Sequence, residues 1–119
     1  MDLMQMFQNY WPIGLVVAWF GYKWWSAQRV RAMLPDLKAA GATLVDVRSA
    51  GEFASGHAPG TINIPLNEIG NRLAEIPKNA PVVLCCASGT RSGMAKLALK
   101  KHGYTQVYNI GTWSQFLKS

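Results

Sequence analysis

Two patterns of hydrophobic and polar positions divide the chain. Over residues 3–25 the apolar side chains occupy every face of a helix, whereas from residue 43 onward short apolar runs alternate with segments of helical periodicity. A helix that is apolar all round lies in a membrane or in a core, and alternating strands and helices are typical of a parallel sheet. We therefore predict an N-terminal hydrophobic helix with a basic connector over residues 1–28, followed by an α/β domain over residues 29–119.

The N-terminal segment has the length and flanking charges of a membrane anchor. Residues 3–25 would span about 34 Å as a helix, which is enough to cross a bilayer. Aromatic residues lie at both ends, Asp2 precedes the segment, and Lys23, Arg29 and Arg31 lie on its C-terminal side. Segments rich in Lys and Arg that flank a transmembrane helix remain on the cytoplasmic side of the membrane. We therefore expect a single-pass transmembrane helix that leaves the folded domain facing the cytoplasm.

Two alternatives remain for this segment. A secretory signal peptide would carry positive charge before the apolar run and a small-residue cleavage site after it, and the charge order here is reversed. A helix that packs against a second copy would instead make the protein a homodimer.

The remaining pattern predicts a three-layer α/β/α fold around a parallel sheet. A polar connector is expected at residues 26–31. Strands are predicted at residues 43–48, 62–64, 82–86 and 106–108, and helices or helical turns at residues 33–40, 50–55, 66–76, 93–102 and 111–117. In such sheets the ligand site lies beyond the carboxyl ends of the strands.

The apolar spacing also predicts which faces of two helices are buried. In the helix at 66–76 the inward face is expected to hold Leu66, Ile69, Leu73 and Ile76. In the helix at 93–102 it is expected to hold Met94, Leu97 and Ala98.

Two adjacent cysteines end the apolar run at 82–86. We assign Cys85 to core packing, because cysteine is among the most buried residue types. Cys86 enters a loop of small polar residues before a helix, where the backbone N–H groups of residues 88–92 can converge on its sulfur. An ordinary thiol with a pKa of about 8.5 is only about 3% thiolate at neutral pH, and such a loop lowers that pKa. Cys86 is therefore the candidate nucleophile, and Arg91 adds positive charge at the rim of the loop.

Composition excludes several other functions. The net charge is +6, but the basic residues are spread from Lys23 to Lys118 without a basic and aromatic stripe, so we do not expect nucleic-acid binding. No other cysteine is present to form a disulfide framework, which fits a reducing compartment. His57 and His102 lie far apart and away from the cysteines, so neither a metal nor another cofactor is predicted.

Two signatures resemble those of the single-domain rhodanese-like sulfurtransferases. The first comprises LVDVR at 44–48, EF at 52–53 and GHAPGTINIP at 56–65, and the second is the loop CASGTRS at 86–92. The resemblance implies that a catalytic cysteine accepts a sulfane sulfur as a persulfide and passes it to a thiol or another nucleophile. Carried over, Cys86 is the nucleophile.

The same resemblance implies roles for the neighbouring residues. The substrate-binding loop comprises Ala87, Ser88, Gly89, Thr90, Arg91 and Ser92. Supporting, mainly structural roles fall to Asp46, Arg48, Glu52 and His57. We expect Arg48 to pair with Glu52 across the turn, and Asp46 and His57 to hold the loops beneath the site.

Two other activities stay open. Related phosphatases and arsenate reductases have a similar fold, but the phosphatases use a longer loop between cysteine and arginine, whereas four residues separate Cys86 from Arg91 here. A tethered interaction module without turnover is the second alternative. Because Arg91 is the only charged residue of the loop, the expected small sulfur donor is either thiosulfate or a thiol persulfide, with a thiol as acceptor.

Overall fold

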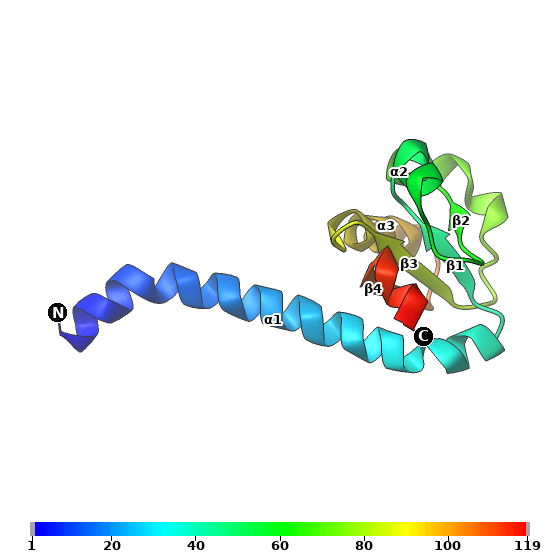
Figure 1. Cartoon of the computed structure of the whole chain (residues 1–119). Helices are drawn as coiled ribbons and strands as arrows, with labels where there is room; N and C mark the ends of the chain where they lie inside the picture. The colour runs from blue at the N-terminus through cyan, green and yellow to red at the C-terminus, as the bar shows by residue number, and fades with distance from the viewer. Residues whose placement is uncertain (1, 119) are drawn as a thin grey trace.

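The computed structural model describes residues 2–118 and is built around a four-stranded parallel sheet (Figure 1). Its strands run in the order β2-β1-β3-β4, and every neighbouring pair is parallel. They comprise β1 (Thr43–Asp46), β2 (Ile62–Asn63), β3 (Val82–Cys86) and β4 (Val107–Thr112). The prediction of an α/β fold with a parallel sheet is confirmed, although β4 extends well beyond the predicted 106–108.

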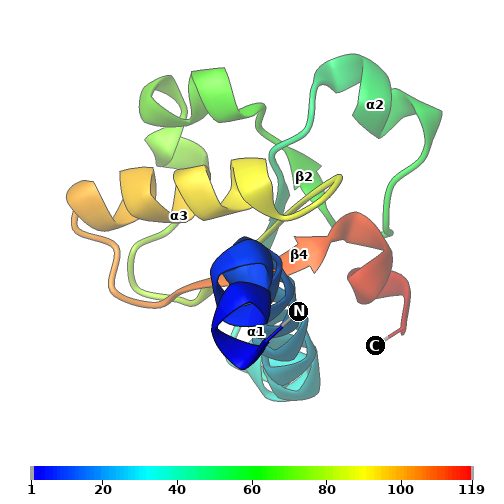
Figure 2. The ribbon, with the colours of Figure 1, turned by 90° about the vertical axis from the view of Figure 1, so that its left-hand side faces the viewer.

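Helices cover both faces of the sheet. On one face, α3 (Thr90–Lys101) and the 3₁₀ helices η1 (Leu66–Asn71) and η2 (Leu73–Glu75) enclose a core that includes Val45, Leu84 and Leu99. On the other face, the last part of α1 (Leu3–Ala39) and the 3₁₀ helix η3 (Trp113–Lys118) enclose a second core (Figure 2). The short helix α2 (Ala50–Ser55) follows β1, as predicted.

The first helix is continuous, which corrects the predicted connector at 26–31 and the separate helix at 33–40. It runs from Leu3 to Ala39 through the predicted domain boundary at residues 28–29. The intervening residues favour a helix, and Val30, Leu34 and Leu37 are buried against the sheet. Because tertiary packing stabilises the helix, it continues past Pro35, whose missing N–H would otherwise weaken it.

The N-terminal part of α1, at residues 3–18, projects away from the domain (Figure 1), and the molecule measures 58 × 32 × 28 Å. The large apolar side chains of this part are exposed, as Phe7 at 75% and Leu15 at 61% illustrate. Within residues 2–118, no helix contains a stretch both long and apolar enough to cross a membrane, so the expected transmembrane helix is not supported.

Two other helix predictions need correction. Residues 66–76 form η1 and η2 instead of one amphipathic α-helix, since Gly70 and Asn71 are poor helix formers. In α3 the buried residues are Ser92, Ala95 and Leu99. Met94 and Leu97, predicted to face inward, are 56% and 67% exposed. The buried face of α3 is therefore rotated about the helix axis from the predicted one and includes the polar Ser92.

Candidate functional site

Cys86 ends β3, and its sulfur lies inside the loop that leads to α3. The residue has no exposed surface. The backbone N–H of Gly89 donates a hydrogen bond to Cys86 Sγ at 2.9 Å, and the Ser92 hydroxyl lies 3.4 Å from the same sulfur. Burial raises the pKa of the thiol, but hydrogen bonds from Ser92, Ser88 and Gly89 outweigh it, so the pKa lies below its usual value.

Cys85 has the opposite environment. It lies on the other face of the sheet, in the core shared with Leu34 and Ile110, and it is fully buried. Burial raises the pKa of its thiol, and the negative charge of Asp46 on the neighbouring strand raises it further. Cys85 is therefore a neutral packing residue, while Cys86 has the environment of a thiolate.

Asn109 on β4 orders the loop and was missed in the sequence. Its amide nitrogen donates to the Gly89 carbonyl at 3.0 Å, and its Oδ1 accepts from the backbone N–H of Gly111 at 2.9 Å. These two bonds fix the orientation of the amide, so that Oδ1 also accepts from the Ser92 hydroxyl at 2.7 Å. Asn109 directly follows the predicted strand at 106–108, and a polar residue at the carboxyl end of a parallel strand was the available signal.

The Ser92 hydroxyl has one proton and two acceptors. The bond to Asn109 is the shorter, so the hydroxyl donates there while Cys86 is a neutral thiol. A thiolate is the stronger acceptor, because hydrogen bonds to charged groups are stronger than those between neutral groups. We therefore expect the Ser92 proton to turn to the sulfur when Cys86 ionises.

The close approach of the loop to β4 requires glycine at two positions. Gly89 has φ +94° and Gly111 has φ +91°, both in the left-handed region. A Cβ atom on Gly89 would lie 3.2 Å from the Gly111 Cα. The absence of both side chains lets the Gly89 N–H face Cys86 at the start of α3, where the helix dipole also favours an anion.

Arg91 pairs with Glu52, which corrects the predicted pair of Arg48 with Glu52. Its guanidinium donates two hydrogen bonds to the carboxylate, at 2.7 and 3.0 Å. The pKa of Glu52 is lowered to about 2, mainly by the hydrogen bonds from Arg91 and to a smaller extent by those from Ser49 at the N-cap of α2. The charge of Arg91 is thus largely neutralised, and it adds less positive potential to the loop than expected.

Asp46 and Arg48 instead form a buried pair. Arg48 donates to both carboxylate oxygens of Asp46 at 2.7 to 3.0 Å, and it also donates to the Gly56 carbonyl at 2.7 Å. Its guanidinium lies 4.8 Å from the ring centre of Trp113. The pair therefore ties the end of β1 to the loop after α2 and to η3, beneath the site.

The other predicted site residues make local contacts. His57 stacks on Phe53, with ring centres 3.7 Å apart, and its Nδ1 lies 2.9 Å from the Phe53 carbonyl oxygen. Ala87 and Thr90 are exposed on the loop, where the Thr90 hydroxyl accepts a bond from Ser88 at 3.4 Å. His57 therefore has a local structural contact and no contact with Cys86.

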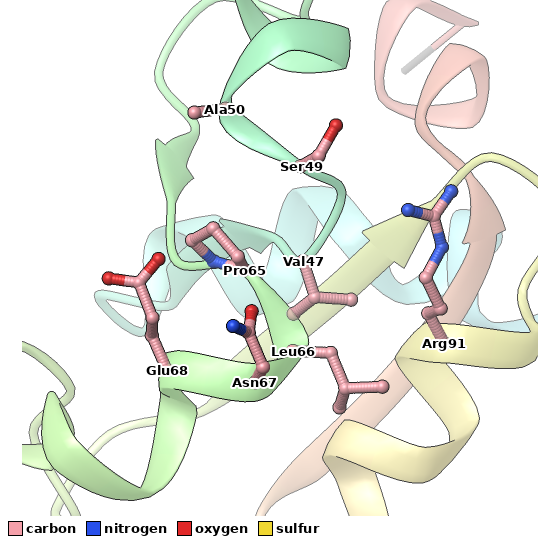
Figure 3. Close-up of a pocket in the computed structure, with 8 residues that line it drawn as sticks. All are labelled: Val47, Ser49, Ala50, Pro65, Leu66, Asn67, Glu68 and Arg91. Atoms are coloured by element: carbon pink, nitrogen blue, oxygen red, sulfur yellow. The ribbon is translucent and has the colours of Figure 1, made fainter.

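Two hollows flank the loop. The first, of about 520 Å³, lies between Arg91 on one side and Val47, Leu66 and Glu68 on the other (Figure 3). The second, of about 550 Å³, lies between the loop and α1. Of the loop residues, Arg91 lines the first hollow, and residues 88–90 line the second.

We predict that Ser92→Ala raises the Cys86 pKa, because the thiolate loses a hydrogen bond that stabilises its charge. The alkylation rate of Cys86 against pH gives this pKa directly, and its midpoint should move upward. Thr90→Ala is the matched control, because the Thr90 hydroxyl bonds to Ser88 and not to the sulfur. Equal midpoints in wild type and Ser92→Ala would contradict the hydrogen bond to the thiolate.

The chain is similar in sequence and in fold to known sulfurtransferases and rhodaneses. The chain is 44% identical over 69 residues to the thiosulfate sulfurtransferase PspE of Escherichia coli, covering 56% of this chain and 66% of that protein. A solved structure described as a rhodanese with anions from E. coli has 37% identity and a TM-score of 0.59, covering 62% of this chain and 89% of that one. The human single-domain sulfurtransferase TSTD1 has 31% identity and a TM-score of 0.58, covering 74% and 92%.

The family assignment rests on the domain as a whole. The matches cover 36 to 66% of the length of four curated relatives from Bacillus subtilis, Allochromatium vinosum and E. coli. The model of the rhodanese-like domain matches residues 26–119, from the middle of α1 to the end of the sequence. The chain therefore belongs to the rhodanese-like domain family.

Proposed function

We propose that the protein is a sulfurtransferase that carries a sulfane sulfur on Cys86 as a persulfide. The observation that carries this proposal is the hydrogen bonding of one buried sulfur by the Gly89 N–H and Ser92 at the start of α3. This arrangement stabilises an anion on Cys86 before and after it gains a sulfur atom. The names of relatives such as PspE and TSTD1 support the same reaction type.

Two successive thiolate attacks move the sulfur atom from the donor to Cys86 and then to the acceptor. The Cys86 thiolate attacks the outer sulfur of the donor, the bond between the two donor sulfurs breaks, and sulfite or a thiolate leaves with the electron pair. A thiol acceptor, as its thiolate, then attacks the outer sulfur of the Cys86 persulfide and takes it away. Cys86 returns as a thiolate, so no external oxidant or reductant is consumed. Asn109 and Gly89 serve as positioning residues for the loop.

Intact-mass measurement tests the proposal. After incubation with thiosulfate or glutathione persulfide, we expect a gain of about 32 Da on Cys86, which cyanide or dithiothreitol removes. No gain with either donor, together with turnover of an aryl phosphate, would instead establish a phosphatase.

We propose separately that the exposed apolar part of α1 at residues 3–18 holds the domain at a membrane, with Cys86 on the cytoplasmic side. The exposed aromatic side chains of this segment and the basic residues on its C-terminal side support the proposal. Full-length protein should then resist a carbonate wash, and protease added outside intact cells should leave Cys86 undigested. Extraction by carbonate would contradict the anchor, and digestion from outside would contradict the orientation.

A further inference from the structure

The hollow between α1 and the active loop is large enough for an organic molecule. It measures about 550 Å³, within the range of about 300–1,000 Å³ that is usual for small-molecule sites. One wall is the α1 segment at residues 19–27, which contributes Trp19, Phe20 and Lys23. The opposite wall comes from the loop, β4 and η3, including Gly89 and Gln115. A bare thiosulfate ion would fill little of this volume.

Lys23 brings a positive charge close to the catalytic loop. A Cβ atom placed on Gly89 would lie 3.8 Å from Lys23 Cε, and the N–H of the same Gly89 donates to Cys86 Sγ at 2.9 Å. The ammonium lies 4.4 Å from the ring centre of Trp19, which holds it on the side of the cavity. In the described part of the chain, Lys23 forms no ion pair with a carboxylate.

Charge distinguishes the two hollows that flank the loop. The hollow on the far side contains Glu68 and Arg91, and the charge of Arg91 is matched by Glu52. The hollow beside α1 contains Lys23 and no acidic residue. An anionic substrate is therefore attracted to the α1 side.

Gln115 adds an unused hydrogen-bonding group to the same cavity. It lines the wall opposite α1, and its amide oxygen is buried without a hydrogen-bond partner among residues 2–118. Leaving such a buried acceptor unsatisfied is unfavourable, because the group has lost its hydrogen bonds to water. An N–H group of a ligand, reached by a small rotation of the amide, would satisfy it.

We propose that residues 19–27 of α1 form the donor site and that Lys23 selects an anionic organic persulfide, a low-molecular-mass thiol persulfide that carries carboxylate and amide groups. This inference rests on the proposed sulfurtransferase function. The carboxylate of the donor pairs with Lys23, its amide N–H faces Gln115, and its apolar stem lies along Trp19. The Cys86 thiolate attacks the outer donor sulfur, and the donor thiolate leaves through the same cavity.

Steady-state kinetics of the full chain in a neutral detergent test the role of Lys23, with glutathione persulfide as donor and cyanide as acceptor. Lys23→Gln should raise the donor KM about fivefold, the size expected for losing one partly exposed charge contact, while kcat stays unchanged. Lys23→Glu should raise KM further, and Lys23→Arg should restore it. Arg29→Gln is the matched control, because Arg29 lies over Trp25 on the same helix, outside the cavity.

A second readout separates this inference from the proposed function. The ratio of Cys86 alkylation rates by anionic iodoacetate and neutral iodoacetamide should fall in Lys23→Gln and stay unchanged in Arg29→Gln. If wild type turns over but neither KM nor this ratio responds to Lys23, the α1 donor site is wrong. If wild type forms no persulfide, the proposed function fails, and a ratio that still responds to Lys23 supports the anion site alone.

Discussion

Cys86→Ser should abolish sulfur transfer, whereas Cys85→Ser should retain most of it. The two thiols are adjacent in sequence but lie on opposite faces of the sheet, one in the hydrogen-bonding loop and the other in the core. A serine hydroxyl is not ionised at neutral pH and cannot accept a sulfane sulfur, so we expect a loss of at least about a thousandfold, typical of removing a nucleophile. The pKa of the Cys85 thiol is raised by burial, which makes it unreactive.

The measurement is turnover with thiosulfate and with glutathione persulfide, alongside the mass of the intermediate. The gain of about 32 Da should be present in Cys85→Ser and absent in Cys86→Ser. Cys85→Ala is a second control, because burying a hydroxyl in the Cys85 site costs stability when it finds no partner. Activity that survives in Cys86→Ser and disappears in both Cys85 variants would reverse the assignment.

The local parts of the site could be predicted from the sequence. An apolar run, a cysteine, a short polar loop and a helix follow one another within a few residues, and the sheet order then places Cys86 at a strand end. The fold class was predictable for the same reason, since strand and helix periodicities alternate along residues 43–112. These features depend on neighbours in sequence, and the structure agrees with them.

Contacts between distant segments were not predictable in the same way. Glu52 pairs with Arg91, 39 residues away, although Arg48 was nearer in sequence. Asn109 reaches the loop only because β4 lies beside β3 with a register shift at Leu84 and Cys85. Lys23 lies next to Gly89 because α1 continues without a break, whereas the sequence predicted a connector at residues 26–31. Each of these partners depends on tertiary packing.

Asp46→Asn should destabilise the domain by about 3–5 kcal/mol, the cost of breaking a buried ion pair by removing one charge. Asp46 has no exposed surface and Arg48 is 5% exposed, so water cannot solvate the guanidinium that remains. Asparagine keeps the shape of aspartate, and the expected loss therefore reports the charge and not a cavity. Urea unfolding monitored by circular dichroism gives the free energy of unfolding.

Glu75→Gln is the matched control for this prediction. It removes one charge from the pair that Glu75 forms with Arg72 at 2.6 Å, but Glu75 is exposed and Arg72 is partly exposed. Water and salt screen such a pair, so the expected loss is much smaller than that of Asp46→Asn. Equal losses in Asp46→Asn and Glu75→Gln would contradict a structural role for the buried pair. A large loss in Asp46→Asn alone, with the Cys86 alkylation pKa unchanged where the variant is folded, would assign the first signature to stability and not to sulfur chemistry.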